Sequence, residues 1–470
     1  MRRRRLLLAF FAAVALMPAH ADTGRDGPPP NVVLILADDL GYSGLQDWGS
    51  AYLETPHIDA IGDAGMRFTN GLAAYPVCKP TRAALLTGQY GARTGVHRVA
   101  DRHAGQENRI RFRVPENRDL SPAAVTLAEV FRDHGYATAM FGKWHVADNR
   151  SGHPVNHGFD RAVVSQSSHF DFETWPDTPV PDPTMTAGEF MTDQALDFME
   201  GAVAERRPFF LFMPYFLVHR PLQSRPADIA HFRAKLAGND DAELPVVAAM
   251  TRDLDRLVGR LDAKLEALGV FADTVVVFTS DNGAYNDSLV GGLRGRKGQV
   301  YEGGMRVPYY FRYPGHIAAG TVRDDRIITV DLYPTLLDLA GIGPPPDLPL
   351  DGTSLEPLLR GRQEALPERP LICFYPKYAR FNAATGRWRD SWRNVLYRSD
   401  YKYIGYPEYG SAELFNLARD PGEHRDLAGE EPARLAAMRA ELTALLRSMN
   451  VPDPEPNPDF VPPAAETKPR

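Results

Sequence analysis

The sequence predicts an α/β protein: a large, mainly parallel sheet sandwiched by helices, followed by a small C-terminal α+β subdomain with a short antiparallel sheet. Continuous apolar runs alternate with helical patterns, as in strands that are buried on both faces of a parallel sheet. These runs are 31–36 (NVVLIL), 136–141 (YATAMF), 208–213 (PFFLFM) and 274–279 (TVVVFT). Short aromatic strands then follow between 370 and 417, which is typical of a separate α+β unit.

The clearest helix lies over 250–268, where leucines and one valine recur at helical spacing. Proline-rich stretches at 176–183 and 343–349 predict surface loops. The second loop places a boundary between a catalytic domain, 31–350, and a subdomain, 351–450. That subdomain should end in an amphipathic helix over 431–448, before an irregular tail, 451–470.

The pattern at the N-terminus predicts a targeting segment. Four arginines, Arg2 to Arg5, precede an uncharged apolar stretch that is short for a membrane span, and Ala19-His20-Ala21 fits a cleavage site. We expect a signal peptide, 1–21, a linker, 22–30, and an exported protein, periplasmic or secreted. An uncleaved anchor is the alternative. No later segment is apolar for long enough to span, so we expect no stable membrane insertion after cleavage.

The composition excludes several classes of protein. With 470 residues, 44% hydrophobic and 24% charged, the chain is neither disordered, collagen-like nor a multi-span membrane protein. Cleavage would remove four arginines and take the net charge from −7 to −11. An acidic protein is a poor nucleic-acid binder, so we expect no nucleic-acid partner and, for an anionic substrate, a local positive field.

Polar residues follow each of the four buried strands. They are Asp38 and Asp39, Lys143 and His145, His219, and Asp281 and Asn282. The carboxyl ends of parallel strands share one edge of the sheet, where ligands bind. Adjacent aspartates repel each other unless a cation holds them, and an all-oxygen set favours Ca²⁺ or Mg²⁺ over Zn²⁺. Each acidic pair alone could be a turn former, but their coincidence at two strand ends favours a metal site.

Cys78 is the second candidate centre. Residues 81–86 look like the start of a helix, which leaves Cys78 just before its N-terminus, where the helix dipole favours an anion, and places Arg82 on the same face. The chain has one other cysteine, Cys373. An oxidising destination could pair the two, although two cysteines are too few for a disulfide framework. A buried, inert thiol is the alternative for Cys78.

Cys78-x-Pro80-x-Arg82 followed by Leu-Thr-Gly resembles the signature of the type I, formylglycine-dependent sulfatase family, of the alkaline phosphatase-like superfamily. The resemblance covers about 31–448. Its further blocks are ADDLG at 37–41, TPHIDAI at 55–61, FGKWHV at 141–146, SDNG at 280–283, KGQVYEGGMRVP at 297–308 and ELFNLARDPGEHRDLA at 413–428. Lys79 departs from the small residue or cysteine that is usual there. We expect its side chain to be solvated or salt-bridged, and its effect on conversion of Cys78 is open.

The resemblance implies that a maturation enzyme converts Cys78 to formylglycine (3-oxoalanine). It also implies a metal, Ca²⁺ or Mg²⁺, in a centre formed by Asp38, Asp39, Cys78, Asp281 and Asn282. One hydroxyl of the aldehyde hydrate would attack sulfur, and loss of a proton from the other would expel sulfate. In this mechanism Arg82 stabilises the ionised hydrate, and Lys143 and Lys297 neutralise the sulfate oxygens. His145 is the base, and His219, with Lys297, serves the leaving oxygen.

Two segments of the sequence could contact the substrate and so determine which ester is cleaved. The segment 98–118 carries six arginines that could reach the site, although a solvated, self-paired loop is the alternative; they are Arg98, Arg102, Arg109, Arg111, Arg113 and Arg118. The segment 165–175 offers hydroxyls, His169 and Trp175 to a sugar ring. We therefore expect a sulfated saccharide as substrate. A phosphoester or phosphonate hydrolase of the same superfamily, or a non-catalytic protein that binds sulfated glycans, remain the alternatives.

Overall fold

The computed structural model describes residues 28–97, 99, 108–111, 119–147, 152–382 and 385–461. The predicted signal peptide, 1–21, most of the linker and the end of the tail lie outside these residues. Within them, no helix is long and apolar enough to cross a membrane.

The core is an eight-stranded sheet in the order β5-β4-β6-β1-β7-β8-β2-β9. All four predicted strands are present, and they lie side by side and parallel at its centre: β4 (Ala137–Gly142), β6 (Phe209–Pro214), β1 (Asn31–Ala37) and β7 (Thr274–Ser280). Val33 of β1 pairs with Leu211 on one side and with Val276 on the other. The carboxyl ends of these strands therefore meet at one edge, as the sequence predicts.

Four further strands complete this sheet: β5 (Arg161–Val164), β8 (Tyr309–Arg312), β2 (Met66–Leu72) and β9 (Thr321–Ile328). β8 runs antiparallel to both of its neighbours, β7 and β2, and the other pairs are parallel. The sheet is thus mainly parallel, in agreement with the predicted fold class.

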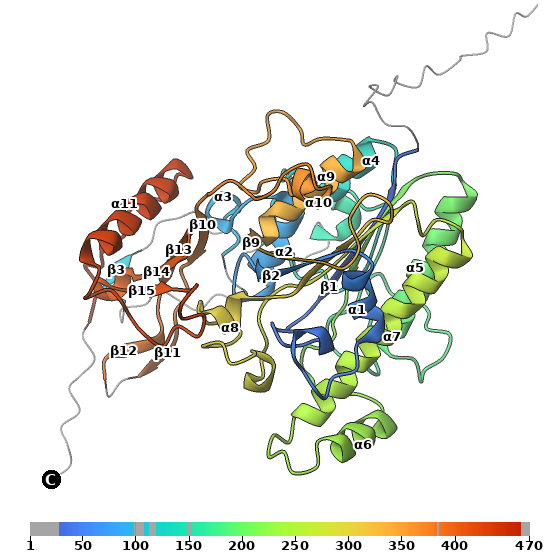
Figure 1. The fold of residues 1–470 in the computed structure, drawn as a ribbon, viewed down its shortest axis with the longest axis horizontal. Helices are drawn as coiled ribbons and strands as arrows, with labels where there is room; N and C mark the ends of the chain where they lie inside the picture. The colour runs from blue at the N-terminus through green and yellow to red at the C-terminus, as the bar shows by residue number, and fades with distance from the viewer. Residues whose placement is uncertain are drawn as a thin grey trace, which may run out of the picture.

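Helices cover both faces of the sheet (Figure 1). Alternate residues of β1 point to opposite sides, so Val33 and Ile35 pack in one hydrophobic cluster and Val32 and Leu34 in another. The first cluster includes α1 (Pro56–Asp63), α5 (Ala187–Ala204), α6 (Pro226–Lys235) and α7 (Leu244–Ala267). The second includes α2 (Cys78–Thr87), α4 (Leu127–Asp133), α9 (Leu332–Ala340) and α10 (Glu356–Leu359). Two shorter helices are α3 (Gly91–Thr94) and α8 (Glu302–Met305).

The C-terminal unit is built on a four-stranded antiparallel sheet in the order β10-β13-β14-β15. Its strands are β10 (Leu371–Tyr375), β13 (Arg393–Arg398), β14 (Tyr401–Tyr406) and β15 (Ser411–Asn416). The predicted helix is present as α11 (Pro432–Ser448), which packs on β13 and β14 (Figure 1). A hairpin, β11 (Ala379–Asn382) and β12 (Arg387–Asp390), extends from this unit.

The tail is not irregular throughout. Its β16 (Glu455–Pro456) pairs antiparallel with β3 (Ile110–Arg111), and Asn457 donates its side-chain amide to the Asn108 carbonyl at 2.7 Å. The prediction of an irregular tail was therefore wrong at this point. Composition indicated no core-forming pattern there, and the pairing depends on a partner more than 300 residues earlier in the chain.

Candidate active site

Three buried carboxylates meet where β1 and β7 end. Asp38 and Asp39 follow β1, and Asp281 follows β7, the neighbouring strand. The Asp39 amide donates to Asp281 Oδ1 at 3.3 Å, and Asp39 has a left-handed backbone with φ of 63°. One oxygen from each carboxylate and the Cys78 sulfur all lie within 4.8 Å of one another. The sheet brings these side chains from two strand ends to one point.

Asn282 completes this group with an unsatisfied oxygen. Its Nδ2 donates to Asp39 Oδ1 at 2.7 Å and to the Gly283 carbonyl at 2.9 Å. Its Oδ1 is buried and accepts no hydrogen bond. Leaving a buried acceptor unpaired costs about 1–3 kcal/mol of folding free energy, so a bound group that pairs with this oxygen would stabilise the fold. Three carboxylates and an amide oxygen are hard ligands, and the residues present therefore fit a divalent cation such as Ca²⁺ or Mg²⁺.

Cys78 is the first residue of α2. The helix therefore begins three residues earlier than the sequence predicts, and Cys78 lies inside its first turn rather than before it. Its thiol donates to Asp38 Oδ1 at 3.4 Å. Burial, together with the negative charges of Asp281 and Asp38, raises the pKa of the Cys78 thiol above its ordinary value. An unmodified thiol at this position stays protonated, which makes it a weak nucleophile.

Three cations surround the carboxylates. Arg82, on the same helix as Cys78, donates from Nε to Asp281 Oδ2 at 2.9 Å and lies 3.3 Å from Asp38. Lys143 forms a short contact with Asp38, and Lys297 lies 2.7 Å from Asp39. Burial opposes charge on Lys297, but the negative groups around it, Asp39 first among them, together raise the pKa of the lysine well above its ordinary value. The three cations equal the three carboxylates in number, so the local positive field that an anionic substrate requires would come from a bound divalent cation.

The two predicted histidines border this cluster. His219 Nε2 lies 3.8 Å from Asp39 Oδ2. His145 has a left-handed backbone, with φ of 56°. Burial, with the nearby charges of Lys143 and Arg82, lowers the pKa of His145 to about 2. In this environment His145 is neutral.

Lys79 is buried rather than solvated. Its side chain is 1% exposed, and its ammonium lies 3.2 Å from Asp119. The expected salt bridge is confirmed. A buried, paired lysine can be tolerated because Asp119 offsets the cost of removing its charge from water.

The residues expected to select the substrate lie elsewhere or are only partly described. Of the six arginines, Arg98, Arg102, Arg113 and Arg118 lie outside the described residues. Arg109 stacks on Phe460 at 5.2 Å, and Arg111 donates to Asn457 at 2.8 Å, so both engage the C-terminal tail. His169 Nε2 lies 2.8 Å from the His219 carbonyl oxygen, which places it against the catalytic candidate.

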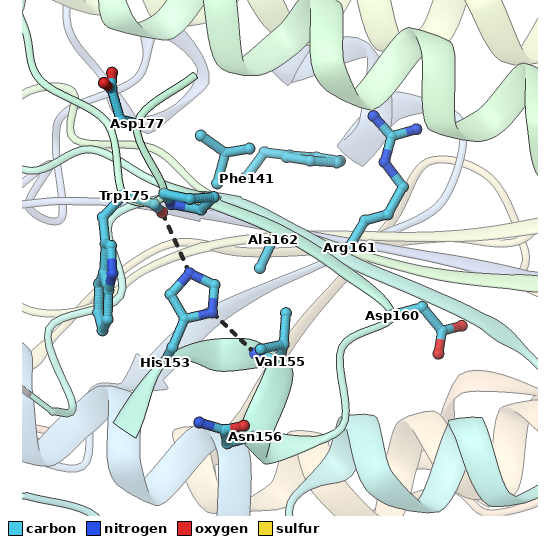
Figure 2. A pocket seen from close by; sticks show the side chains of 11 residues that line it. Phe141, His153, Val155, Asn156, Asp160, Arg161, Ala162, Trp175 and Asp177 are labelled. Atoms are coloured by element: carbon cyan, nitrogen blue, oxygen red, sulfur yellow. Dashed lines mark hydrogen bonds between the residues drawn. The ribbon is translucent and has the colours of Figure 1, made fainter. Parts of the chain in front are cut away.

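Trp175 lines a cavity of about 700 Å³ beside β5, the edge strand of the sheet (Figure 2). Its ring meets the His153 ring edge-on at 4.4 Å, and its carbonyl oxygen lies 3.3 Å from His153 Nε2. None of the predicted catalytic or metal residues lines this cavity. The expectation that Trp175 serves the active site therefore finds no support in its position.

A buried charge cluster joins the two sheets, and sequence reasoning assigned it no role. Lys402 of β14 lies 3.0 Å from Glu302 and 2.8 Å from Glu423, and all three side chains are fully buried. Glu423 also accepts the Glu302 amide at 2.7 Å. Glu302 and Glu423 lie in two of the sequence blocks that resemble the sulfatase family, and this was the only sign in the sequence that they matter. The structure shows that Lys402 joins them.

The mainly parallel sheet and the cation-rich carboxylate site at its edge together define a hydrolase of the alkaline phosphatase-like class. Residues 30–342 match the family model described as sulfatase, and residues 296–451 match the model described as N-sulphoglucosamine sulphohydrolase, C-terminal. The chain therefore belongs to the sulfatase family and is a sulfuric ester hydrolase.

Known proteins resemble nearly the whole chain. It is 33% identical to an N-acetylgalactosamine-6-sulfatase of Sus scrofa, over 87% of this chain and 84% of that protein. It is 31% identical to arylsulfatase A of Homo sapiens, over 93% of this chain and 89% of that protein. Among solved structures, that of Ps i-CgsB in complex with k-i-k-neocarrahexaose superposes with a TM-score of 0.76 at 26% identity, over 93% of this chain and 94% of that chain.

Proposed function

We propose that this sulfatase releases sulfate from a sulfated saccharide and that residue 78, matured to formylglycine, is its nucleophile. The observation that carries this proposal is the placement of Cys78 within 4.8 Å of three buried carboxylates at the start of a helix. The N-acetylgalactosamine-6-sulfatase relative and the neighbour in complex with k-i-k-neocarrahexaose support a saccharide substrate. The overall reaction consumes one water, breaks the ester link to sulfate, and yields an alcohol and sulfate.

Cys78 needs maturation for a chemical reason. The raised pKa keeps its thiol protonated, and attack by sulfur would leave a thiosulfate ester with no easy exit. A hydrated aldehyde at this position supplies two hydroxyls, one to attack and one whose deprotonation drives release. We accordingly propose a formylglycine-generating maturation enzyme as a partner of the chain.

The remaining residues bind, orient and move protons. Asp38, Asp39, Asp281 and Asn282 would hold a divalent cation, which supplies Lewis-acid stabilisation of negative charge on sulfate oxygen. Arg82 holds the ionised hydroxyl of residue 78, and the ammonium groups of Lys143 and Lys297 orient the sulfate. Neutral His145 accepts the proton whose loss releases sulfate, and His219 delivers one to the leaving oxygen, assisted by Lys297.

We predict that the bound cation is Ca²⁺, with Mg²⁺ as the second choice, because every candidate donor on the aspartates and Asn282 is a hard oxygen. Chelation should abolish sulfate release, and adding back Ca²⁺ or Mg²⁺ should restore it. The measurement is the rate with each metal, together with metal content by mass spectrometry of the purified protein. Restoration by Zn²⁺ alone would contradict this assignment.

The alternative activity is hydrolysis of a phosphoester or a phosphonate ester. One divalent cation and several protein cations can stabilise a tetrahedral phosphorus anion as well as sulfate. We expect kcat/KM for an aryl sulfate to exceed that for the matched aryl phosphate and phosphonate esters. A higher value for either phosphorus ester would overturn the sulfate assignment of the natural substrate. Binding of a sulfated glycan without any release of sulfate would instead favour the non-catalytic alternative.

We also propose export through a signal peptide, 1–21, to the periplasm or the medium, since the chain begins with a basic and then apolar segment. N-terminal sequencing of exported protein should begin at Asp22. The boundary between the catalytic domain, 31–350, and the C-terminal subdomain, 351–450, stays a proposal: the sulfatase match ends at 342, and the second match, 296–451, crosses the boundary.

A further inference from the structure

Tyr285 is an exposed aromatic residue next to the candidate site. Its side chain is 47% exposed, whereas the other large hydrophobic side chains exposed in the described part of the chain are all valines. It follows Asp281 and Asn282 by only a few residues. A large exposed apolar group beside a functional centre is informative, because aromatic side chains are usually buried.

Tyr285 is connected through neighbouring residues to both residues proposed to serve the leaving oxygen, His219 and Lys297. On one side, the guanidinium of Arg220, the residue after His219, lies 4.3 Å from the centre of the Tyr285 ring. On the other side, the Lys297 amide donates to the carbonyl oxygen of Ala284, the preceding residue, at 2.9 Å. These contacts set Tyr285 on the side of the site where His219 and Lys297 would meet the alcohol part of a bound ester.

Exposure increases outward along this path. The aspartates are at most 4% exposed, and the side chains of Lys297, His219 and Arg220 are 17%, 28% and 39% exposed. The sugar that carries the sulfate would occupy the level of His219 and Lys297. Tyr285 and Arg220 form the next level outward, where a second sugar of a longer chain would lie.

The Tyr285 ring is held before any ligand arrives. Arg220, which covers it, is paired with Glu243. The following residue, Asn286, donates to Asp241 at 3.0 Å and accepts the Ser288 amide at 2.7 Å. A fixed tyrosine offers a flat contact at little cost in conformational entropy, and the adjacent guanidinium offers donors to hydroxyl or acidic groups.

We infer that Tyr285 and Arg220 form a binding subsite for the sugar next to the sulfated one, so that the preferred substrate is an oligosaccharide. One apolar face of a pyranose would stack on the face of the Tyr285 ring opposite Arg220, and substituents that reach past the ring would meet Arg220. This inference rests on the proposed function, which it deepens by naming the length of substrate that the site selects.

The test compares KM for 4-nitrophenyl sulfate with KM for sulfated oligosaccharides, namely neocarrahexaose and a chain ending in N-acetylgalactosamine 6-sulfate. Tyr285→Ala should raise the ratio of oligosaccharide KM to aryl KM about tenfold, the order expected from losing one stacked ring. Tyr285→Phe keeps the ring and should restore the native ratio. Val322→Ala, a matched change at an exposed residue of β9, should leave the ratio unaltered.

The outcomes separate the two proposals. Equal changes in both KM values for Tyr285→Ala would overturn the subsite while the sulfatase proposal stands. Native enzyme that hydrolyses the aryl ester but neither oligosaccharide would also overturn it. Native enzyme, with residue 78 matured, that releases sulfate from none of these esters would refute the proposed function itself.

Discussion

Cys78→Ala should abolish sulfate release while leaving the fold intact. Residue 78 would supply the attacking oxygen, and loss of a nucleophile costs about 10⁴-fold or more in turnover. The fold should survive because alanine is the best helix former and the side chain lost is small. Sulfate release and the thermal unfolding midpoint, measured on the same preparation, test both halves of this prediction.

The chain provides a matched control in Cys373. This second cysteine is also free and fully buried, but it lies in β10 of the C-terminal sheet. Cys373→Ala should therefore keep its activity after any small loss of stability from the cavity it leaves. Full turnover by Cys78→Ala, or loss of turnover in the well-folded control alone, would contradict the role of residue 78.

Lys402→Met should be the most destabilising of the single changes considered. Its ammonium lies between Glu302 and Glu423, and all three groups are fully buried. Removing the lysine leaves two carboxylates close together, with Arg306, which donates to Glu302 at 2.9 Å, as the cation that still pairs with Glu302. Removing one partner of a buried ion pair costs about 3–5 kcal/mol of unfolding free energy. Chemical denaturation measures this loss directly.

The size of this loss should depend on pH. Burial raises the pKa of Glu423 to about 7, so this group favours the folded state below its ordinary value of 4.5 and loses that contribution as pH rises through 7. Without Lys402, the pKa of Glu302 in the folded state rises from its lowered value, and that of Glu423 rises further. The gap between native and Lys402→Met stability should therefore be wider at pH 8 than at pH 5.5.

A lysine at the surface serves as the control for this pair of measurements. Lys235 lies 3.0 Å from Glu54 in an exposed ion pair, and such pairs contribute little to stability. Lys235→Met should leave the denaturation midpoint nearly unchanged at both pH values. A gap for Lys402→Met that is no larger than this control would show that the buried cluster does not stabilise the junction of the two sheets.

The centre of the fold could be predicted because its strands have a distinct pattern. A strand such as β7, TVVVFT, is covered on both faces, so apolar residues run without interruption. By contrast, β9, TVRDDRII, lies at the edge of the same sheet and carries charged residues that no local pattern assigns to a strand. The pairing of β16 with β3 was missed for a similar reason, since it depends on contacts distant in sequence.

The carboxylates and Lys143 of the candidate site could also be predicted from the sequence, because they follow strands that the sequence predicts. Parallel strands deliver whatever follows them to one edge, so Asp38, Asp281 and Lys143 are brought together by topology alone. The contact between Glu302 and Lys402 joins residues 100 apart in the sequence, and no local sequence pattern predicts it. The sequence did not predict a role for Tyr285 either, because its exposure and its contact with Arg220 are properties of the folded surface.

The chemical state of residue 78 tests the central proposal most directly. Trypsin should release residues 68–82 as one peptide, because Pro80 protects the bond after Lys79. In an active preparation, we predict that the mass of this peptide shows replacement of the thiol group, CH₂–SH, by an aldehyde, CHO, or its hydrate. A fully active preparation in which this peptide carries only an unmodified cysteine would contradict the account.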